Sequence, residues 1–355
     1  EALPVESYTD FHLHVDANGS ILARSDEGER KGKMPLSISP EVQLPLDLIR
    51  NNKTSEKLIK GLGEQLYELL FPNAIDKHFN QTEAVARGRN QSIRIRLTVD
   101  PDNLARIPWE FAYRSEEGYF LSTNPHTVFS RYLELARPAR TRTNSTGPLD
   151  LLLIIAAPDD QGALDPDEWE AIATEALAEP IQDERIRVRV VKKATRREIS
   201  DALLKKNPNI VQFVGHAIYK DGRGYLALVD SQTGGTWAVD DERFAGLFMG
   251  SDSQLGLVSL AACESATSES PRGFLGIAPQ LVQRGTPAVI AMQYSVLAST
   301  SKVFLDQFYR AVAARKPLDW ALQSARNAIF QERGLDSREF ATPVLYMRAR
   351  DGQVF

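Results

Sequence analysis

The feature that most constrains the fold is a regular alternation of apolar, strand-like runs with helix-like stretches after residue 148. The clearest run, Leu149–Ala157, is apolar at almost every position, which is typical of a strand buried on both faces. Strands that alternate with helices form a mostly parallel sheet covered by helices on both faces. We expect further strands at 185–191, 209–215, 254–262, 287–293 and 342–348, a hairpin over 224–239, and helices at 167–181, 195–206, 274–284, 300–315 and 318–331.

The N-terminal part of the chain has a different pattern, which predicts an α+β region. Turn residues between two apolar stretches predict a hairpin, and leucines at helical spacing predict a helix. The expected elements are a hairpin over 8–15 and 20–24, a helix over 55–70 and a half-buried strand over 92–99. We therefore predict an N-terminal region, 1–136, a linker of Pro, Arg, Ser and Thr residues, 137–148, and a second domain, 149–355.

Composition and charge argue against several classes of function. The net charge is −5 and the pI is near 5.7, so the chain as a whole has no electrostatic footprint for nucleic acid or an anionic membrane. No stretch approaches the roughly 18 apolar residues of a membrane span, and no secretory signal is recognised. We expect no cofactor, because no phosphate-binding loop is found, and no metal, although His12 and His14 alternate on one predicted strand.

Cysteine usage points to the compartment. A single cysteine in 355 residues cannot form an internal disulfide, which fits a reducing, cytoplasmic setting. The chain begins at Glu1 rather than at a methionine, which fits a processed end or a longer parent protein.

Three arginines, Arg185, Arg187 and Arg189, alternate with apolar residues in one predicted strand. Charges at this spacing are typical of an edge strand that avoids pairing with other sheets, and we favour that interpretation. A binding site for an acidic partner is the alternative.

The single cysteine and one histidine occupy equivalent places in the predicted sheet. Cys263 follows the strand predicted over 254–262, and His216 follows the strand predicted over 209–215. Loops at the carboxyl ends of parallel strands form the crevice in which open α/β sheets bind ligands. A lone cysteine is more often buried and inert, but Cys263 enters a loop of small and polar residues. The pair is therefore a candidate for nucleophilic catalysis.

In such a site Cys263 would attack a scissile carbonyl, and His216 would protonate the departing amine and later activate water. The thiol pKa of about 8.5 makes a nearby imidazolium useful, because it stabilises the thiolate. The oxyanion needs two fixed donors. We expect these to be the backbone N–H groups of Cys263 and Ala217, both just past strand ends.

Four segments together resemble the CHAT family of caspase-like cysteine peptidases, which are relatives of caspases and separases. They read VQFVGHA, LVSLAACESA, FLGIAPQLVQRGTPAVIAMQYSV and KPLDWALQSAR. The resemblance extends over Leu149–Met347 and, through the segment LARIPWEFAY, partly over Ile95–Tyr132; nothing specific is found before Ile95. It implies a caspase-like three-layer α/β sandwich, a catalytic dyad of His216 and Cys263, and an N-terminal region that is a pseudo-caspase or has a docking or regulatory role.

The sequence departs from its relatives at the substrate pocket. Metacaspase-like relatives carry an acid two residues before the cysteine and caspases carry a glutamine, whereas this chain has Ala261. The aspartate that many relatives carry after the next strand is also missing. A pocket without charge disfavours a buried Arg or Lys, so we expect an apolar, leucine-like P1 residue. The expected pocket residues are Ala261, Tyr294, Val296 and Ala298, with Asp159 and Asp160 able to restore a basic preference.

The resemblance also implies partners. Bacterial members often act in signalling or antiviral defence by cutting a dedicated protein, such as a gasdermin-like pore-forming effector, and are held inactive until a sensor or activator engages them. A peptidase of this kind is the leading hypothesis. The alternatives are a catalytically idle scaffold or interaction module and a hydrolase of small amides or esters.

Overall fold

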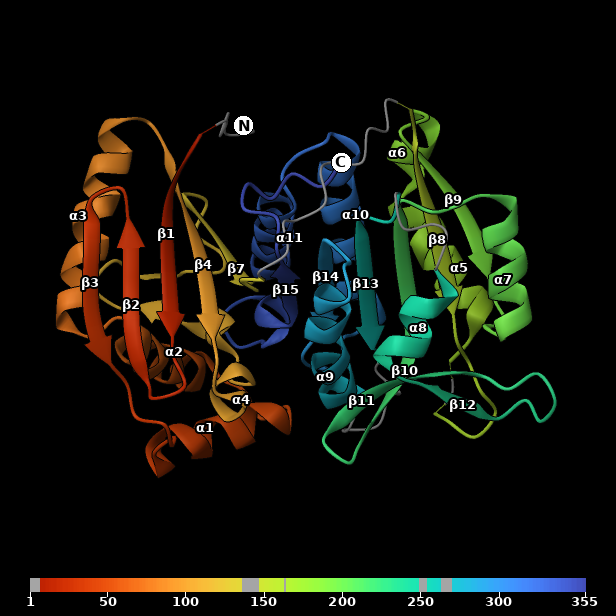
Figure 1. The fold of residues 1–355 in the computed structure, drawn as a ribbon, viewed down its shortest axis with the longest axis horizontal. Coiled ribbons are helices and arrows are strands. Elements are labelled where there is room, and N and C mark those ends of the chain that lie inside the picture. The colour runs from red at the N-terminus through yellow and green to blue at the C-terminus, as the bar shows by residue number, and fades with distance from the viewer. Residues whose placement is uncertain (1–6, 136–146, 163, 249–253, 263–269) are drawn as a thin grey trace. The chain divides into compact units, whose positions relative to one another are not determined.

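The computed structural model describes residues 7–135, 147–162, 164–248, 254–262 and 270–355. The chain divides into two compact units. The first consists of Glu1–Tyr132 with Arg326–Ala341, and the second of Leu133–Ala325 with Thr342–Phe355. The boundary near the C-terminus falls inside one helix, α11 (Leu318–Arg333), labelled in Figure 1.

The first unit contains a five-stranded sheet in the order β3–β2–β1–β4–β7. Strands β1, β4 and β7 are parallel, and β1, β2 and β3 are joined as antiparallel neighbours. The strands are β1 (Tyr8–Val15), β2 (Ser20–Ser25), β3 (Gly28–Lys33), β4 (Ser92–Val99) and β7 (Thr127–Tyr132), with the short pair β5 (Tyr113–Arg114) and β6 (Tyr119–Phe120). The helices are α1 (Pro40–Arg50), α2 (Glu56–Leu70), α3 (Asn73–Gly88) and α4 (Asp102–Ala105), with single turns at Trp109–Phe111 and Glu339–Ala341.

The predicted hairpin and helix of this unit are present. Strand β1 pairs with β2, and α2 begins after Ser55, whose side chain accepts a hydrogen bond from the Leu58 N–H. The prediction for β4 is wrong in one respect, because this strand is not half-buried. Arg94 and Arg96 on its polar face are also buried, with Arg94 over the Tyr8 ring at 4.0 Å.

The second unit is built on a mostly parallel sheet in the order β9–β8–β10–β13–β14–β15, in which only β15 is antiparallel to its neighbour. The strands are β8 (Leu149–Ile155), β9 (Ile186–Val191), β10 (Ile210–Lys220), β13 (Leu257–Ala262), β14 (Ala288–Met292) and β15 (Pro343–Met347). The hairpin strands are β11 (Arg223–Val229) and β12 (Thr236–Val239). The helices are α5 (Pro166–Ala176), α6 (Ala178–Gln182), α7 (Arg196–Lys205), α8 (Asp241–Leu247), α9 (Ser270–Gln283), α10 (Ala298–Ala313) and the first half of α11.

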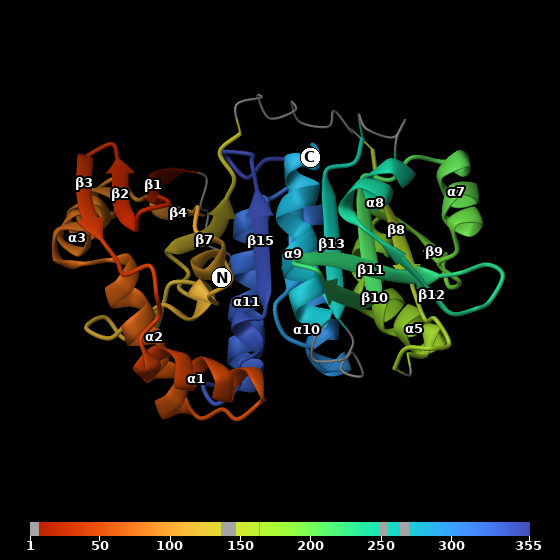
Figure 2. The same cartoon turned by 60° about the horizontal axis from the view of Figure 1, so that its bottom comes forward.

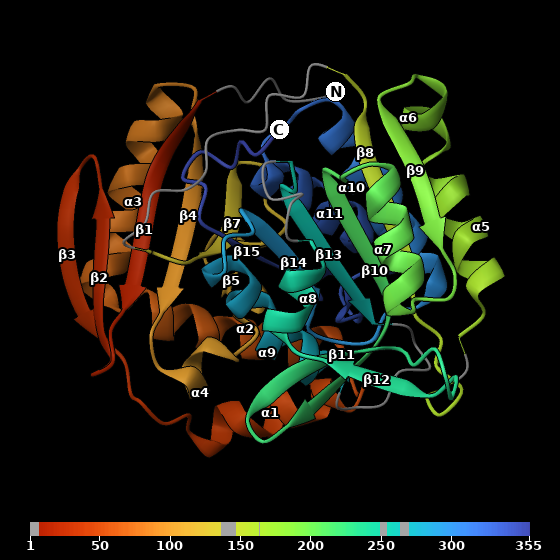
Figure 3. The same cartoon turned by 45° about the vertical axis from the view of Figure 1, so that its right-hand side comes forward.

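Helices cover both faces of this sheet. On one face, Phe274 of α9 packs against Phe213 of β10, with ring centroids 6.1 Å apart. On the other, Tyr309 of α10 donates a hydrogen bond to the side chain of Gln212, the preceding residue of β10, at 2.8 Å. Figure 3 shows α7 and α8 in front of the strands and α10 behind them. The expected three-layer α/β sandwich is therefore confirmed.

Strand β10 is longer than predicted because it pairs in two ways. Its first half lies between β8 and β13, and its second half, from His216 to Lys220, forms an antiparallel hairpin with β11. Glycines hold α9 close to this hairpin, because a Cβ at Gly224 would lie 2.0 Å from the carbonyl oxygen of Gly273. A Cβ at Gly273 would in turn lie 2.7 Å from that of Ala217 in β10, so a side chain at either glycine would push the first turn of α9 away from the β10–β11 hairpin.

Candidate active site

Several loops that carry predicted site residues begin at the same edge of the second unit's sheet. Strands β8, β10, β13 and β14 are parallel, so their carboxyl ends lie at one edge. In the register of this sheet, Gly215 at the end of β10's parallel half pairs with Ala262, the last residue of β13. His216 and Cys263 are the next residues of the chain. Cys263, the predicted nucleophile and oxyanion donor, lies outside the described residues.

The imidazole of His216 has one bound and one unbound nitrogen. Its side chain is fully buried, and Nε2 lies 3.0 Å from the carbonyl oxygen of Gly162 in the loop after β8. Because a carbonyl oxygen can only accept, Nε2 carries the proton in the neutral ring. Nδ1 is buried and has no hydrogen-bond partner among the described residues. This nitrogen is therefore available as a base.

Burial also sets the protonation state of His216. Burial lowers the pKa of the imidazole below its usual value, and the bond to the Gly162 carbonyl offsets this only in part. The neutral, basic form is therefore favoured at neutral pH. A nearby thiolate or other anion would favour the imidazolium instead.

This shift predicts a loss of stability on acidification. The unfolded chain protonates His216 near pH 6.5 and the folded chain only at lower pH, so the unfolded state binds more protons as pH falls through this window. Urea unfolding at about pH 7.5 and about pH 5.5 should show a smaller stability loss in His216→Gln than in the wild type. His78, whose pKa burial also lowers, keeps its contribution in both proteins. An equal loss of stability in the wild type and in His216→Gln would contradict this prediction.

The loop that holds Gly162 is hydrogen-bonded to the turn of the β11–β12 hairpin. Figure 2 shows this hairpin, in which β11 lies beside β10. The Asp159 N–H donates to the Gly234 carbonyl at 3.0 Å. The Thr236 hydroxyl donates a hydrogen bond to Asp160 Oδ1 at 2.6 Å. It also accepts a hydrogen bond from Gln161 Nε2 at 2.9 Å. The Thr236 bonds lower the pKa of Asp160 and so favour its carboxylate form. We call this set of bonds the loop strap, and it fixes the residues that lead to Gly162.

The other predicted residues are placed as follows. Ala261 is buried next to the end of β13. Ala217 was expected just past a strand end, but it is buried inside β10, because the strand continues into the hairpin and Ala217 pairs with Leu226. The remaining pocket residues follow β14, with Tyr294 and Val296 buried and Ala298 partly exposed as the first residue of α10. The oxyanion and pocket roles stay predictions.

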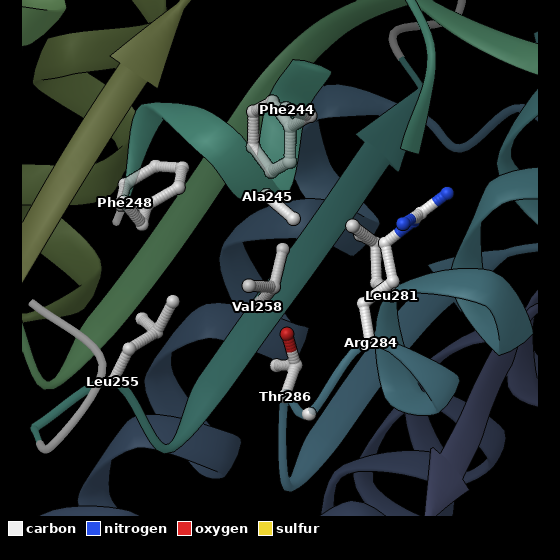
Figure 4. A pocket seen from close by; sticks show the side chains of 9 residues that line it. Phe244, Ala245, Phe248, Leu255, Val258, Leu281, Arg284 and Thr286 are labelled. Atoms are coloured by element: carbon white, nitrogen blue, oxygen red, sulfur yellow. The ribbon is translucent and has the colours of Figure 1, made fainter. Parts of the chain in front are cut away.

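A pocket visible in the structure lies elsewhere. Figure 4 shows it between α8, the start of β13 and the end of α9. Val258, which lines it, is the second residue of β13, so the pocket is at the opposite end of this strand from Cys263. Its other lining residues include Phe244, Phe248, Leu255, Leu281 and Arg284.

The described residues contain neither a metal site nor a membrane-spanning helix. His12 and His14 stack at 6.4 Å, but their Nε2 atoms lie 3.0 Å from Thr98 Oγ1 and from Asp100 Oδ2. The described residues contain no group of three or more His, Cys, Asp and Glu side chains that could hold a metal ion. None of the helices that the structure describes is long and apolar enough to cross a bilayer.

Two residues of the site were not predicted, Gly162 and Thr236. The first acts through its carbonyl oxygen, which every residue has, so no sequence pattern marks it. The second is a threonine in a strand, and only the folded loop brings it to Asp160.

Comparison with known protein families supports the resemblance found in the sequence. A model of the CHAT domain matches residues 60–344, well over half of the chain, and it includes residues before Ile95 in which no resemblance was found. Comparison with curated proteins gives no match. The chain belongs to the CHAT-domain family, a family of caspase-like peptidases.

Proposed function

We propose that this protein is a cysteine endopeptidase in which Cys263 is the nucleophile and His216 the acid–base residue. The observation that carries the proposal is the unpartnered, buried Nδ1 of His216, a residue that directly follows Gly215, the partner of Ala262 in the strand before Cys263. A base whose ring is held in place through its other nitrogen is what a cysteine nucleophile requires.

The reaction would proceed through an acyl-enzyme. Nδ1 of His216 accepts the thiol proton, and the thiolate of Cys263 adds to the scissile carbonyl carbon. The oxyanion would be stabilised by the backbone N–H groups of Ala217 and Cys263. His216 then protonates the departing amine as the C–N bond breaks and a thioester remains. Finally, His216 removes a proton from water, which hydrolyses the thioester and restores the thiol.

Specificity for an apolar P1 residue is part of this proposal. Ala261 and Val296 offer no charge to a basic side chain, and the Thr236 hydroxyl already binds Asp160 Oδ1. A peptide library scanned at P1 should be cleaved best after leucine-sized residues, and Cys263→Ser should abolish the cleavage. Efficient cleavage only after Arg or Lys would overturn the apolar assignment and would indicate that Asp159 or Asp160 binds the P1 side chain.

The loop strap should affect the rate through the Gly162 carbonyl. Thr236→Val removes both hydrogen bonds of the hydroxyl, so we expect kcat to fall by about tenfold, because a small misplacement of a catalytic group is costly. Thr236→Ser should restore the rate. Thr233→Val is the matched control, because that hydroxyl bonds only to Asp230 and to Gly235 in the same turn. Equal rates in the two valine variants would remove the loop strap from the mechanism.

Partners follow from the family and from the burial of the site. We propose a dedicated cytoplasmic protein substrate, such as a gasdermin-like effector in bacterial defence, and an upstream activator or sensor. The complete burial of His216 supports the activator, because a peptide must reach the imidazole before cleavage. The same burial favours the second candidate, a catalytically idle scaffold. N-terminal sequencing of fragments produced from genomic-neighbour proteins by the wild type, with Cys263→Ala as control, separates the two candidates.

A further inference from the structure

The strongest concentration of positive charge in the chain lies on β9 and α7. Residues 185–206 contain nine of the 42 Lys and Arg residues but only two of the 47 Asp and Glu residues. This concentration occurs in a protein whose net charge is −5. The segment directly precedes β10 in the chain, but none of its residues takes part in the proposed reaction.

The structure separates the cations with a structural role from those without one. Arg189 donates to the carbonyl oxygens of Ala202 and Lys206 and so closes the end of α7. Other cations of the segment form ion pairs, for example Lys206 with Asp150 at 2.5 Å. Four exposed cations have no hydrogen-bond or ion-pair partner among the described residues: Arg187, Lys193, Arg196 and Lys205.

Two further observations point to a polypeptide ligand. In the described part of the chain β9 pairs only with β8, so half of its backbone N–H and C=O groups point away from the sheet. Leu204 of α7, beside Lys205, is 83% exposed, more than any other large apolar side chain that the structure describes. A free strand edge, unpaired cations and an exposed apolar side chain together fit an extended acidic segment that contains apolar residues.

We propose that β9 and α7 form a docking surface for an acidic, extended segment of a partner protein, which adds to β9 as an edge strand. Arg187 and Lys205 pair with its acidic side chains, and Leu204 contacts an apolar one. Both interpretations of these arginines in the sequence then hold. They repel the basic edge of a second copy, as on a protected edge strand, and they attract an acidic strand, as in a binding site. Nucleic acid fits less well, since residues 185–206 contain no aromatic side chain on which bases could stack. A membrane also fits less well, because Ile199 on the apolar face of α7 is buried.

The test is fluorescence anisotropy with the full chain and a labelled peptide of alternating Glu and Val residues. We expect salt-sensitive binding, stronger at about 50 mM than at about 500 mM NaCl. The double variant Arg187→Glu/Lys205→Glu should weaken it by about tenfold or more. Lys53→Glu/Lys57→Glu is the matched control, because it makes the same charge change at exposed, unpaired lysines of the first unit. A peptide N-methylated at alternate backbone nitrogens should bind at least about tenfold more weakly, because it cannot form the ladder.

Four results would overturn the proposal. The first is no peptide binding at low salt, and the second is equal weakening by the two double variants. The third is unchanged binding of the N-methylated peptide, which would exclude strand addition. The fourth is that single-stranded DNA, phosphatidylserine vesicles or a second copy of the chain binds more tightly than the peptide, and that this binding is lost in Arg187→Glu/Lys205→Glu. The surface would then be assigned to that ligand instead.

Discussion

Replacing His216 by alanine should lower the kcat for peptide cleavage by about 10²–10⁴-fold, the range that one acid–base residue contributes. The reason is the geometry of the imidazole: the Gly162 carbonyl holds Nε2, and Nδ1 is left without a partner in the described part of the chain. Alanine removes the group that accepts the thiol proton and returns it to the leaving amine. Initial rates with the best peptide of the P1 library provide the measurement.

A buried histidine of the first unit supplies the matched control. His78 is also buried, and its Nδ1 also lacks a hydrogen-bond partner among the residues described. His78→Ala therefore imitates the packing defect of His216→Ala, but it should leave the kcat of the folded protein within about twofold. Equal losses of kcat in the two variants would indicate a general effect of folding and contradict the role of His216.

The second large effect is expected on stability, at Glu110 in the first unit. This side chain is fully buried and accepts hydrogen bonds from Arg131 at 3.0 and 2.7 Å, while the fully buried Arg326 lies 3.9 Å away. Burial opposes the ionisation of Glu110, but the two arginines outweigh it and hold its pKa below the usual value. Burial lowers the pKa of Arg326 to about 10, which leaves it charged at neutral pH.

Glu110→Gln should therefore destabilise the protein by about 3–5 kcal/mol, because it removes the negative charge that faces two buried arginines. Urea unfolding provides the measurement. Glu29→Gln is the control, since the pair of Glu29 with Arg24 is more than half exposed on both sides, and such a pair contributes about 0–1 kcal/mol. A loss in Glu110→Gln as small as in the control would show that the buried charges are compensated elsewhere.

The sequence predicted those elements whose local signals agree with the packing. Thr195 and Glu198 form a capping pattern, and the structure shows the Glu198 N–H bound to Thr195 Oγ1 at 3.3 Å at the start of α7. The turn at Gly234 has the positive φ that its glycine allows. The buried strands β8 and β13 were equally clear, because apolar residues fill almost all of their positions.

Other elements could not be predicted, and the reasons are physical. Strand β3 has the sequence Gly-Glu-Arg-Lys-Gly-Lys, so it has no apolar face and forms only because β2 offers a partner. Helix α1 contains Pro45, which breaks the helical pattern. The burial of Arg94 and Arg96 depends on tertiary contacts that no alternation of residues reveals.

The candidate site shows the same division. His216 was predicted to lie at the end of a strand, whereas the structure places it inside β10, directly after the half that pairs in parallel with β13. The Gly162 carbonyl and the Thr236 hydroxyl could not be predicted, because a loop brings them to the site. The role of Cys263 stays a prediction from the sequence and the family.

The measurement that tests the central claim most directly is covalent labelling of Cys263. The protein is incubated with a peptidyl chloromethyl ketone that carries leucine at P1, and adduct formation is followed by intact mass. The proposal predicts one adduct per chain, none in Cys263→Ser, and labelling of His216→Ala that is slower by about 10²-fold or more. Labelling of His216→Ala at the wild-type rate would show that the histidine does not activate the thiol, and it would contradict the proposed dyad.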